Sequence, residues 1–179
     1  MNEDKLNLIK EKIFTVKDFP RKGIAFKDIT PIFKEPELVK NIIDLFVEKI
    51  KDIEYDIIVG PESRGFLFGI ALSLAVNKPF VPIRKVGKLP REVISIDYGS
   101  EYGKSTIEIH KDDIKENDKI LIIDDLLATG GTIFAIETLI KSVGAIPVAN
   151  LYLIELVGLQ SKKLESKKIS LIKYEKPYF

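Results

Sequence analysis

Apolar residues along the chain fall into short continuous runs that alternate with longer amphipathic stretches. The continuous runs are bounded by turn residues, which is typical of strands buried on both faces of a sheet. They cover residues 56–60, 80–83, 120–123, 147–156 and 169–173. Apolar positions at three- and four-residue spacing predict helices over residues 1–12, 36–51, 66–76 and 133–143. This alternation predicts an α/β fold with a mostly parallel central sheet, flanked by helices through right-handed crossovers.

Three regions depart from that alternation. Residues 19–31 contain two prolines and a glycine without a clean period, so we expect an ordered loop. Residues 92–110 hold two runs of period two on either side of residues 99–104, which predicts a β-hairpin arm with a long tip. Residues 158–166 predict a short polar helix. The whole chain, residues 1–179, is expected to form a single domain.

The stretch from Lys119 to Thr132 carries the first chemical signal. Its apolar run leads into Asp124 and Asp125, so both acids are expected at the carboxyl end of a strand, where open α/β sheets bind ligands. The Thr-Gly-Gly-Thr that follows leaves backbone N–H groups free at the start of a helix, which favours an anion. A strand end capped by one acid, with the other in solvent, is the alternative, since neighbouring strand residues point to opposite sides.

Composition narrows the class of protein. Hydrophobic residues make up 45% of the 179 residues and charged residues 31%, with a net charge of only +1, which argues against nucleic acid as the main partner. The chain contains no cysteine, which excludes disulfides and thiolate metal sites and suits a reducing compartment. No apolar run approaches the about 20 residues of a membrane span, and residues 1–12 lack a signal-peptide pattern. We therefore expect a cytoplasmic protein without a membrane partner. His110, the only histidine, is given no catalytic role.

Five segments together carry a resemblance to a known family. The segment D-D-L-L-A-T-G-G-T, with the apolar run before it, is similar to the phosphoribosyl-pyrophosphate (PRPP) signature of type I phosphoribosyltransferases. The other four are D-F-P-R-K-G-I-A-F-K-D-I-T-P, G-P-E-S-R-G-F-L-F-G, P-F-V-P-I-R-K-V-G-K-L-P and E-Y-G-K, and in this order they resemble the adenine branch. The resemblance implies a type I phosphoribosyltransferase fold with an N-terminal hood (residues 1–35) and a flexible hairpin arm (residues 92–110).

The resemblance also implies an activity. Such an enzyme transfers the 5-phosphoribosyl group from PRPP to adenine, giving AMP and pyrophosphate in purine salvage, with Mg²⁺ as cofactor and a homodimer as the assembly. Magnesium usually keeps several waters and binds through substrate phosphates, so no direct protein ligand is expected, only proximity to Asp124 and Asp125.

Roles for individual residues follow from the same resemblance. The 5-phosphate and ribose would contact Asp124, Asp125, Ala128, Thr129, Gly130, Gly131 and Thr132. The pyrophosphate would contact Glu62, Ser63, Arg64, Arg84, Lys85 and Lys88, and the Glu62–Ser63 peptide bond is expected to be cis. Adenine would contact Ile24, Ala25, Phe26, Lys27 and Leu126, with Leu127 as the alternative to Leu126. Glu101 would act as the acid/base near adenine N7 while Tyr102 helps to close the site.

Other interpretations stay open at this point. The basic segment 84–91 and Glu101 could each be a solvated charged loop. The activity could be directed to a 6-oxopurine such as hypoxanthine, guanine or xanthine. A regulatory protein of the same fold that senses PRPP is less favoured, because the chain has neither an added DNA-binding domain nor an excess of basic residues.

Overall fold

The computed structural model describes residues 2–100 and 103–178 of the chain. Four α-helices are seen in these residues: α1 (Asn2–Glu11), α2 (Pro36–Ile50), α3 (Arg64–Val76) and α4 (Gly131–Ser142). The strands are β1 (Phe14–Lys17), β2 (Ala25–Asp28), β3 (Ile57–Pro61), β4 (Phe80–Lys85), β5 (Val93–Ser100), β6 (Gly103–His110), β7 (Lys119–Leu127), β8 (Ile146–Leu156) and β9 (Lys167–Tyr174). A 3₁₀-helix, η1 (Thr30–Lys34), precedes α2.

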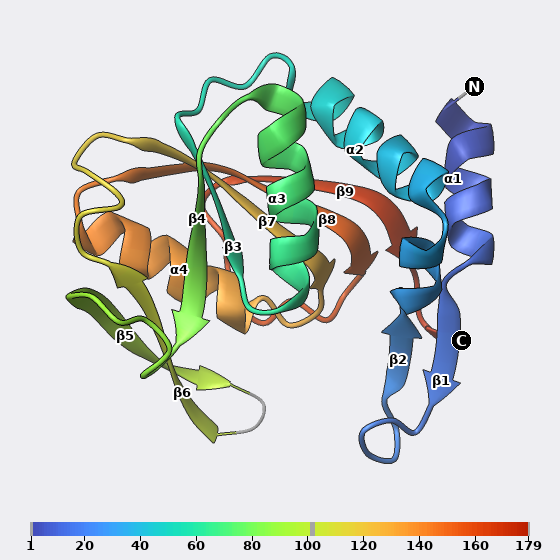
Figure 1. Ribbon diagram of the computed structural model, residues 1–179. Coiled ribbons are helices and arrows are strands. Elements are labelled where there is room, and N and C mark those ends of the chain that lie inside the picture. The colour runs from blue at the N-terminus through green and yellow to red at the C-terminus, as the bar shows by residue number, and fades with distance from the viewer. Residues whose placement is uncertain (1, 101–102, 179) are drawn as a thin grey trace.

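A seven-stranded sheet in the order β5-β6-β4-β3-β7-β8-β9 forms the centre of the molecule. The strands from β4 to β9 in this order run parallel, and β6 joins β4 antiparallel as part of the β5–β6 hairpin. This confirms the α/β fold with a mostly parallel sheet. The β5–β6 arm and the separate β1–β2 hairpin both lie at the end of the sheet to which the β4 arrow points (Figure 1).

Both faces of the sheet are covered, which explains the continuous apolar runs of the sequence. Along β7, Leu121 and Ile123 pack into the core shared with α2 and α3, whereas Ile120 and Ile122 pack into the core shared with α4. All four side chains are fully buried. A helix covers each face (Figure 1), so no polar position is needed within the strand.

The loop expected over residues 19–31 is only partly a loop. Residues 25–28 form β2, which pairs antiparallel with β1, and Val16 lies opposite Phe26. The short β1 was not predicted at all, because four residues without a long period give no reliable signal. Its partner supplies the hydrogen bonds, so the hood is a hairpin rather than an irregular segment.

Three further expectations were wrong. Residues 158–166 form no helix; their polar groups bond to the β7–α4 loop, as Ser161 N–H does to the Thr129 carbonyl at 3.0 Å. The arm has a shorter tip than expected, since Ser100 still pairs with Gly103. Strand β7 also continues through both acids to Leu127, beyond the expected end at Ile123. Within the described part of the chain, none of the helices has the length and hydrophobicity to span a membrane.

Candidate active site

A cavity of about 730 Å³ opens at the carboxyl ends of β3, β4 and β7. Its wall combines the β3–α3 turn, the end of β4, the β7–α4 loop, the part of the arm toward its tip and two residues of the 157–166 loop. Since the central strands are parallel, their carboxyl ends meet at one edge, and polar groups distant in sequence converge there.

Asp124 and Asp125 lie at this edge within the last residues of β7. The backbone N–H of Asp125 donates to Asp124 Oδ1 at 2.8 Å. Burial, and then the neighbouring charge of Asp125, raise the pKa of Asp124 well above its ordinary value. Burial also raises the pKa of Asp125, a residue only 3% exposed, although the guanidinium of Arg64 opposes that shift. The two carboxyl groups therefore lie in surroundings that disfavour their ionisation in the ligand-free protein.

Arg64 faces this pair because α3 starts in close contact with the sheet. A Cβ placed on Gly65 would lie 2.8 Å from Pro61 Cδ and 3.0 Å from the Ile123 carbonyl oxygen, so only glycine permits this approach. Arg64 Nε then lies 3.1 Å from Asp125 Oδ2. The contact lacks the alignment of a hydrogen bond, and Asp125 Oδ2 is buried without a donor among the described residues.

The β7–α4 loop leads directly into the helix. Gly130 adopts φ +81°, a conformation that glycine takes at little cost, and α4 begins at Gly131. The first N–H groups of a helix have no acceptor within it, so those at the start of α4 are available to an anion. The carbonyls of Ala128 and Thr129 are meanwhile held from the other side, by Gln160 Nε2 at 3.3 Å and by Ser161 N–H at 3.0 Å.

The basic residues predicted to meet pyrophosphate divide into two groups. Arg84 Nε donates to Glu62 Oε2 at 2.8 Å, and both side chains line the cavity together with Lys85. Lys88 does not line it, although its carbonyl accepts from Arg84 Nη1 at 3.3 Å. The peptide bond between Glu62 and Ser63 is cis, as the resemblance implied.

The hood reaches the same region through Phe26. The ring of Phe26 lies 5.3 Å from the Arg64 guanidinium carbon and 5.1 Å from the ring of Phe19, edge to face. Lys27 points to the opposite face of the hairpin, as expected for the next residue of a strand. Arg64 thus lies between the acidic pair and the apolar face of the hood.

Comparison with known proteins identifies the family. A model of the phosphoribosyl transferase domain matches residues 28–170, most of the chain. The chain belongs to the phosphoribosyltransferase family. The matched range includes the cavity walls, the acidic pair and the loop before α4, and begins at the last residue of the hood's β2.

Relatives within this family are similar over nearly their whole length. Adenine phosphoribosyltransferase of Malacoplasma penetrans is 58% identical over 93% of this chain and 97% of its own, and that of Ureaplasma parvum 50% over 94% and 98%. The crystal structure of adenine phosphoribosyltransferase from Thermoanaerobacter pseudethanolicus superposes with a TM-score of 0.91 at 44% identity, covering 94% of this chain and 99% of that chain. The crystal structure of the Saccharomyces cerevisiae enzyme, in complex with an imino-altritol bisphosphate and adenine, superposes with a TM-score of 0.89 at 37% identity. It covers 94% of this chain and 99% of that chain.

Most residues that the family resemblance singled out are brought together by the fold. The cavity wall contains Glu62, Ser63, Arg64, Arg84, Lys85, Asp124, Asp125, Leu126, Ala128, Thr129, Gly130, Gly131 and Thr132. Lys88 and residues 24–27 are not part of that wall, and Glu101 and Tyr102 lie outside the described residues.

The cavity also contains residues that the sequence did not indicate. Tyr98, Ser161 and Lys162 line it, and Lys162 adds a further basic residue to the wall. No local motif marks Ser161 or Lys162, because their place depends on the bond between Ser161 N–H and the Thr129 carbonyl.

Proposed function

We propose that this chain transfers the 5-phosphoribosyl group from PRPP to adenine, giving AMP and pyrophosphate. The observation that carries the proposal is the near-complete match to adenine phosphoribosyltransferases, which includes the hood as well as the phosphate loop. The geometry supports it, since one cavity offers an anion cradle, an acidic pair and cations, with an aromatic ring next to Arg64.

Each part of this cavity has a role in the proposal. The N–H groups at the start of α4 bind the 5-phosphate, and Asp124 and Asp125 accept hydrogen bonds from the ribose hydroxyls. Arg64, Arg84 and Lys85 meet the pyrophosphate, with Lys88 joining them only if its loop moves toward the ligand. Phe26 stacks on adenine, whose polar edge bonds to the backbone of residues 24–27, and Leu126 covers the opposite face.

Magnesium fits this site as a partner of the substrate. No group of three or more acidic or histidine side chains that could hold a metal occurs in residues 2–100 and 103–178. The buried Oδ2 of Asp125 accepts no hydrogen bond among the described residues and has only the ion pair with Arg64, and a carboxylate oxygen is a hard donor of the kind that Mg²⁺ and its waters prefer. The ion, bound through the diphosphate, would neutralise charge on the leaving group.

A cytoplasmic location stays a prediction from composition.

The base preference can be tested directly. We expect AMP to form from adenine and PRPP with magnesium, and kcat/KM for hypoxanthine, guanine and xanthine to be at least about a hundredfold lower, because a site that pairs polar edges rejects mismatched ones. Preference for a 6-oxopurine would overturn the adenine assignment. Detectable AMP formation would exclude a purely regulatory role.

Glu101 is proposed as the acid/base of the reaction. We expect Glu101→Ala to lower kcat about a hundredfold, the usual contribution of one positioned proton donor, and to change PRPP binding little. Steady-state kinetics and a direct binding titration separate the two effects. Unchanged turnover would remove Glu101 from the mechanism, and Glu92→Ala, nearer the base of the arm, is the matched control.

We further propose that the protein is a homodimer that uses the outer face of α3. Leu67, Ile70 and Leu74 are 50%, 50% and 80% exposed, and their spacing places them on one stripe of the helix. A contiguous apolar stripe of this kind is typical of an interface between copies.

The dimer has a simple test. We expect the double substitution Ile70→Glu and Leu74→Glu to convert a dimer to a monomer, because each copy would bury two unpaired charges in the interface. Light scattering coupled to size-exclusion chromatography gives the mass. Ile146→Glu, at a residue 46% exposed at the start of β8, is the control and should leave the mass unchanged. A dimer that survives both substitutions on α3 would place the interface elsewhere.

A further inference from the structure

Lys27 has an unusual environment for a lysine. Its side chain is 1% exposed although it belongs to the two-stranded hood. The ammonium donates to Thr15 Oγ1 and to the Tyr178 carbonyl, both at 2.7 Å, and lies 3.9 Å from the centre of the Tyr174 ring. Burial lowers the pKa of Lys27. Burying an ammonium is unfavourable unless its N–H groups donate hydrogen bonds, so Lys27 is stable here only while these contacts are made. They therefore fix the position of the hood relative to the C-terminal segment.

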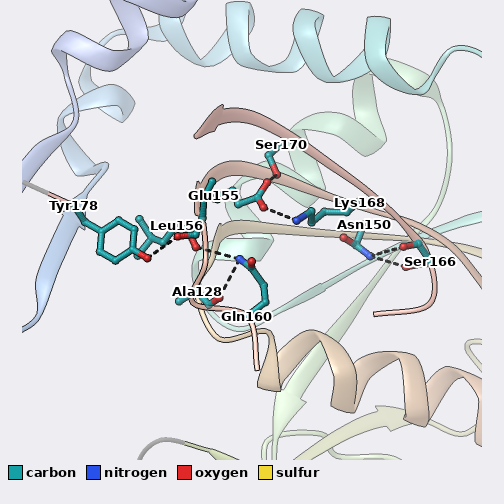
Figure 2. Close-up of polar contacts among 10 residues, drawn as sticks. Ala128, Asn150, Glu155, Leu156, Gln160, Ser166, Lys168, Ser170 and Tyr178 are labelled. Carbon is teal, nitrogen blue, oxygen red and sulfur yellow. Dashed lines mark hydrogen bonds and ion pairs between the residues drawn. The ribbon is translucent and has the colours of Figure 1, made fainter. Parts of the chain in front are cut away.

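The same C-terminal segment also reaches the phosphate loop. Tyr178 Oη donates to the Val157 carbonyl at 2.6 Å, and Val157 N–H donates to the Tyr174 carbonyl at 2.9 Å. Val157 begins the loop that carries Gln160, whose amide donates to the carbonyls of Leu156 at 3.1 Å and Ala128 at 3.3 Å. Figure 2 shows Tyr178 and Gln160 on the two sides of the Leu156 backbone.

We propose that residues 174–178 are a strut that positions both ends of the substrate site. On one side Lys27 ties the hood to the strut, and on the other Val157 and Gln160 tie it to the loop before α4. Lys27 and Gln160 are thus positioning residues whose side chains make their contacts outside the cavity. Lys27 positions the hood that would bind adenine, and Gln160 positions the loop that would bind PRPP. The assignment of each side to one substrate rests on the proposed function.

The two sides predict different kinetic effects. Lys27→Met keeps the length of the side chain and removes the ammonium. We expect KM for adenine to rise about tenfold, because a hydrogen bond to a charged group contributes more than the roughly 1.4 kcal/mol to which a tenfold change corresponds. KM for PRPP should stay within about twofold of the wild-type value. Gln160→Leu should raise KM for PRPP and leave that for adenine unchanged. Lys27→Arg, which keeps two donors, should restore most of the adenine affinity.

Removal of residues 177–179 tests the strut itself. This shortened chain should show both KM increases, and adding Lys27→Met to it should raise KM for adenine by less than in the full-length chain, because the Tyr178 carbonyl, one of the two acceptors of the ammonium, is already absent. Amide hydrogen exchange gives a readout that does not depend on the reaction: exchange over residues 25–28 should become faster in Lys27→Met and in the shortened chain.

The opposite results are equally clear. If Lys27→Met lowers only the melting temperature, with adenine KM and exchange of β2 unchanged, Lys27 is a structural residue and the strut is not a positioning device. If the wild-type protein makes no AMP, the proposed function fails. The exchange experiment still decides whether the C-terminal segment fixes the hood.

Discussion

Replacing Gly131 with valine is expected to lower kcat/KM for PRPP about a thousandfold, because it fills the anion cradle at the start of α4 and blocks several N–H donors together. Gly131 is the first residue of α4 and lines the cavity. A branched side chain at this position would occupy the space in which the 5-phosphate is proposed to bind. The loss should appear mainly as weaker binding of PRPP.

The fold should tolerate this change. A Cβ at Gly131 would lie 3.7 Å from the Gly99 carbonyl oxygen and 3.9 Å from Thr129 Oγ1, which are ordinary van der Waals distances. Gly131 also has no positive φ, in contrast to Gly130. We therefore expect a melting temperature close to that of the wild type, so that lost affinity cannot be attributed to unfolding.

Titration with PRPP and thermal unfolding measure the two quantities separately. Gly131→Ala should give an intermediate loss, since it adds one carbon to the same space, and Ser142→Ala near the other end of α4 is the control. Wild-type affinity in Gly131→Val would mean that the 5-phosphate binds elsewhere in the cavity.

The sequence predicted the parts of this site whose signal is local. The run from Ile120 to Ile123 fixed the central strand, and the glycines marked the helix start. Asp124 and Asp125 could be placed at the carboxyl edge because parallel strands end together. These features depend on neighbouring residues, and the structure confirms each of them, apart from the end of β7.

Features that depend on distant contacts could not be predicted in this way. The hood hairpin exists because β1 pairs with β2 across an intervening turn, and Lys162 reaches the cavity only through the loop contacts of Ser161. The environment of Lys27 is the most distant case, since its partner Tyr178 lies 151 residues away. From the sequence, Lys27 was only one of four hood residues, 24–27, that were expected to contact adenine. The structure separates Lys27, whose side chain contacts the C-terminal segment, from Phe26, whose ring faces Arg64.

Replacing both Asp124 and Asp125 with asparagine is expected to lower kcat/KM about a thousandfold and yet to stabilise the free protein. The loss follows because two carboxylates that accept from ribose hydroxyls become amides, and each charge-assisted hydrogen bond contributes about 1.5–3 kcal/mol. The gain follows because the ligand-free enzyme no longer bears the cost of ionising two buried neighbouring carboxyl groups, a cost that Arg64 opposes at Asp125. The amide oxygen that takes the place of Asp124 Oδ1 can still accept from the next backbone N–H.

The effect of the Asp124→Asn substitution on stability should depend on pH in a defined direction. The pKa of Asp124 is raised in the folded state, so the unfolded chain ionises first, from near 3.8 upward. Between that value and the raised folded pKa the native state binds more protons, and the stability of the wild type falls as pH rises through this window. Below the window wild type and variant should be nearly equal in stability, and above it the variant should be the more stable of the two.

Urea unfolding of wild type and Asp124→Asn from pH 4 to 8, without substrates, measures this difference. Asp52→Asn, at an exposed turn, is the control for removing one acid from the surface, and its difference from wild type should be small across the range. A variant that is less stable than wild type at neutral pH would contradict the argument, because it would mean that the Asp124 charge is stabilised in the free protein. If the substitutions raise the stability of the free protein and lower its activity, the two carboxylates reduce the free energy of unfolding in exchange for binding the substrate.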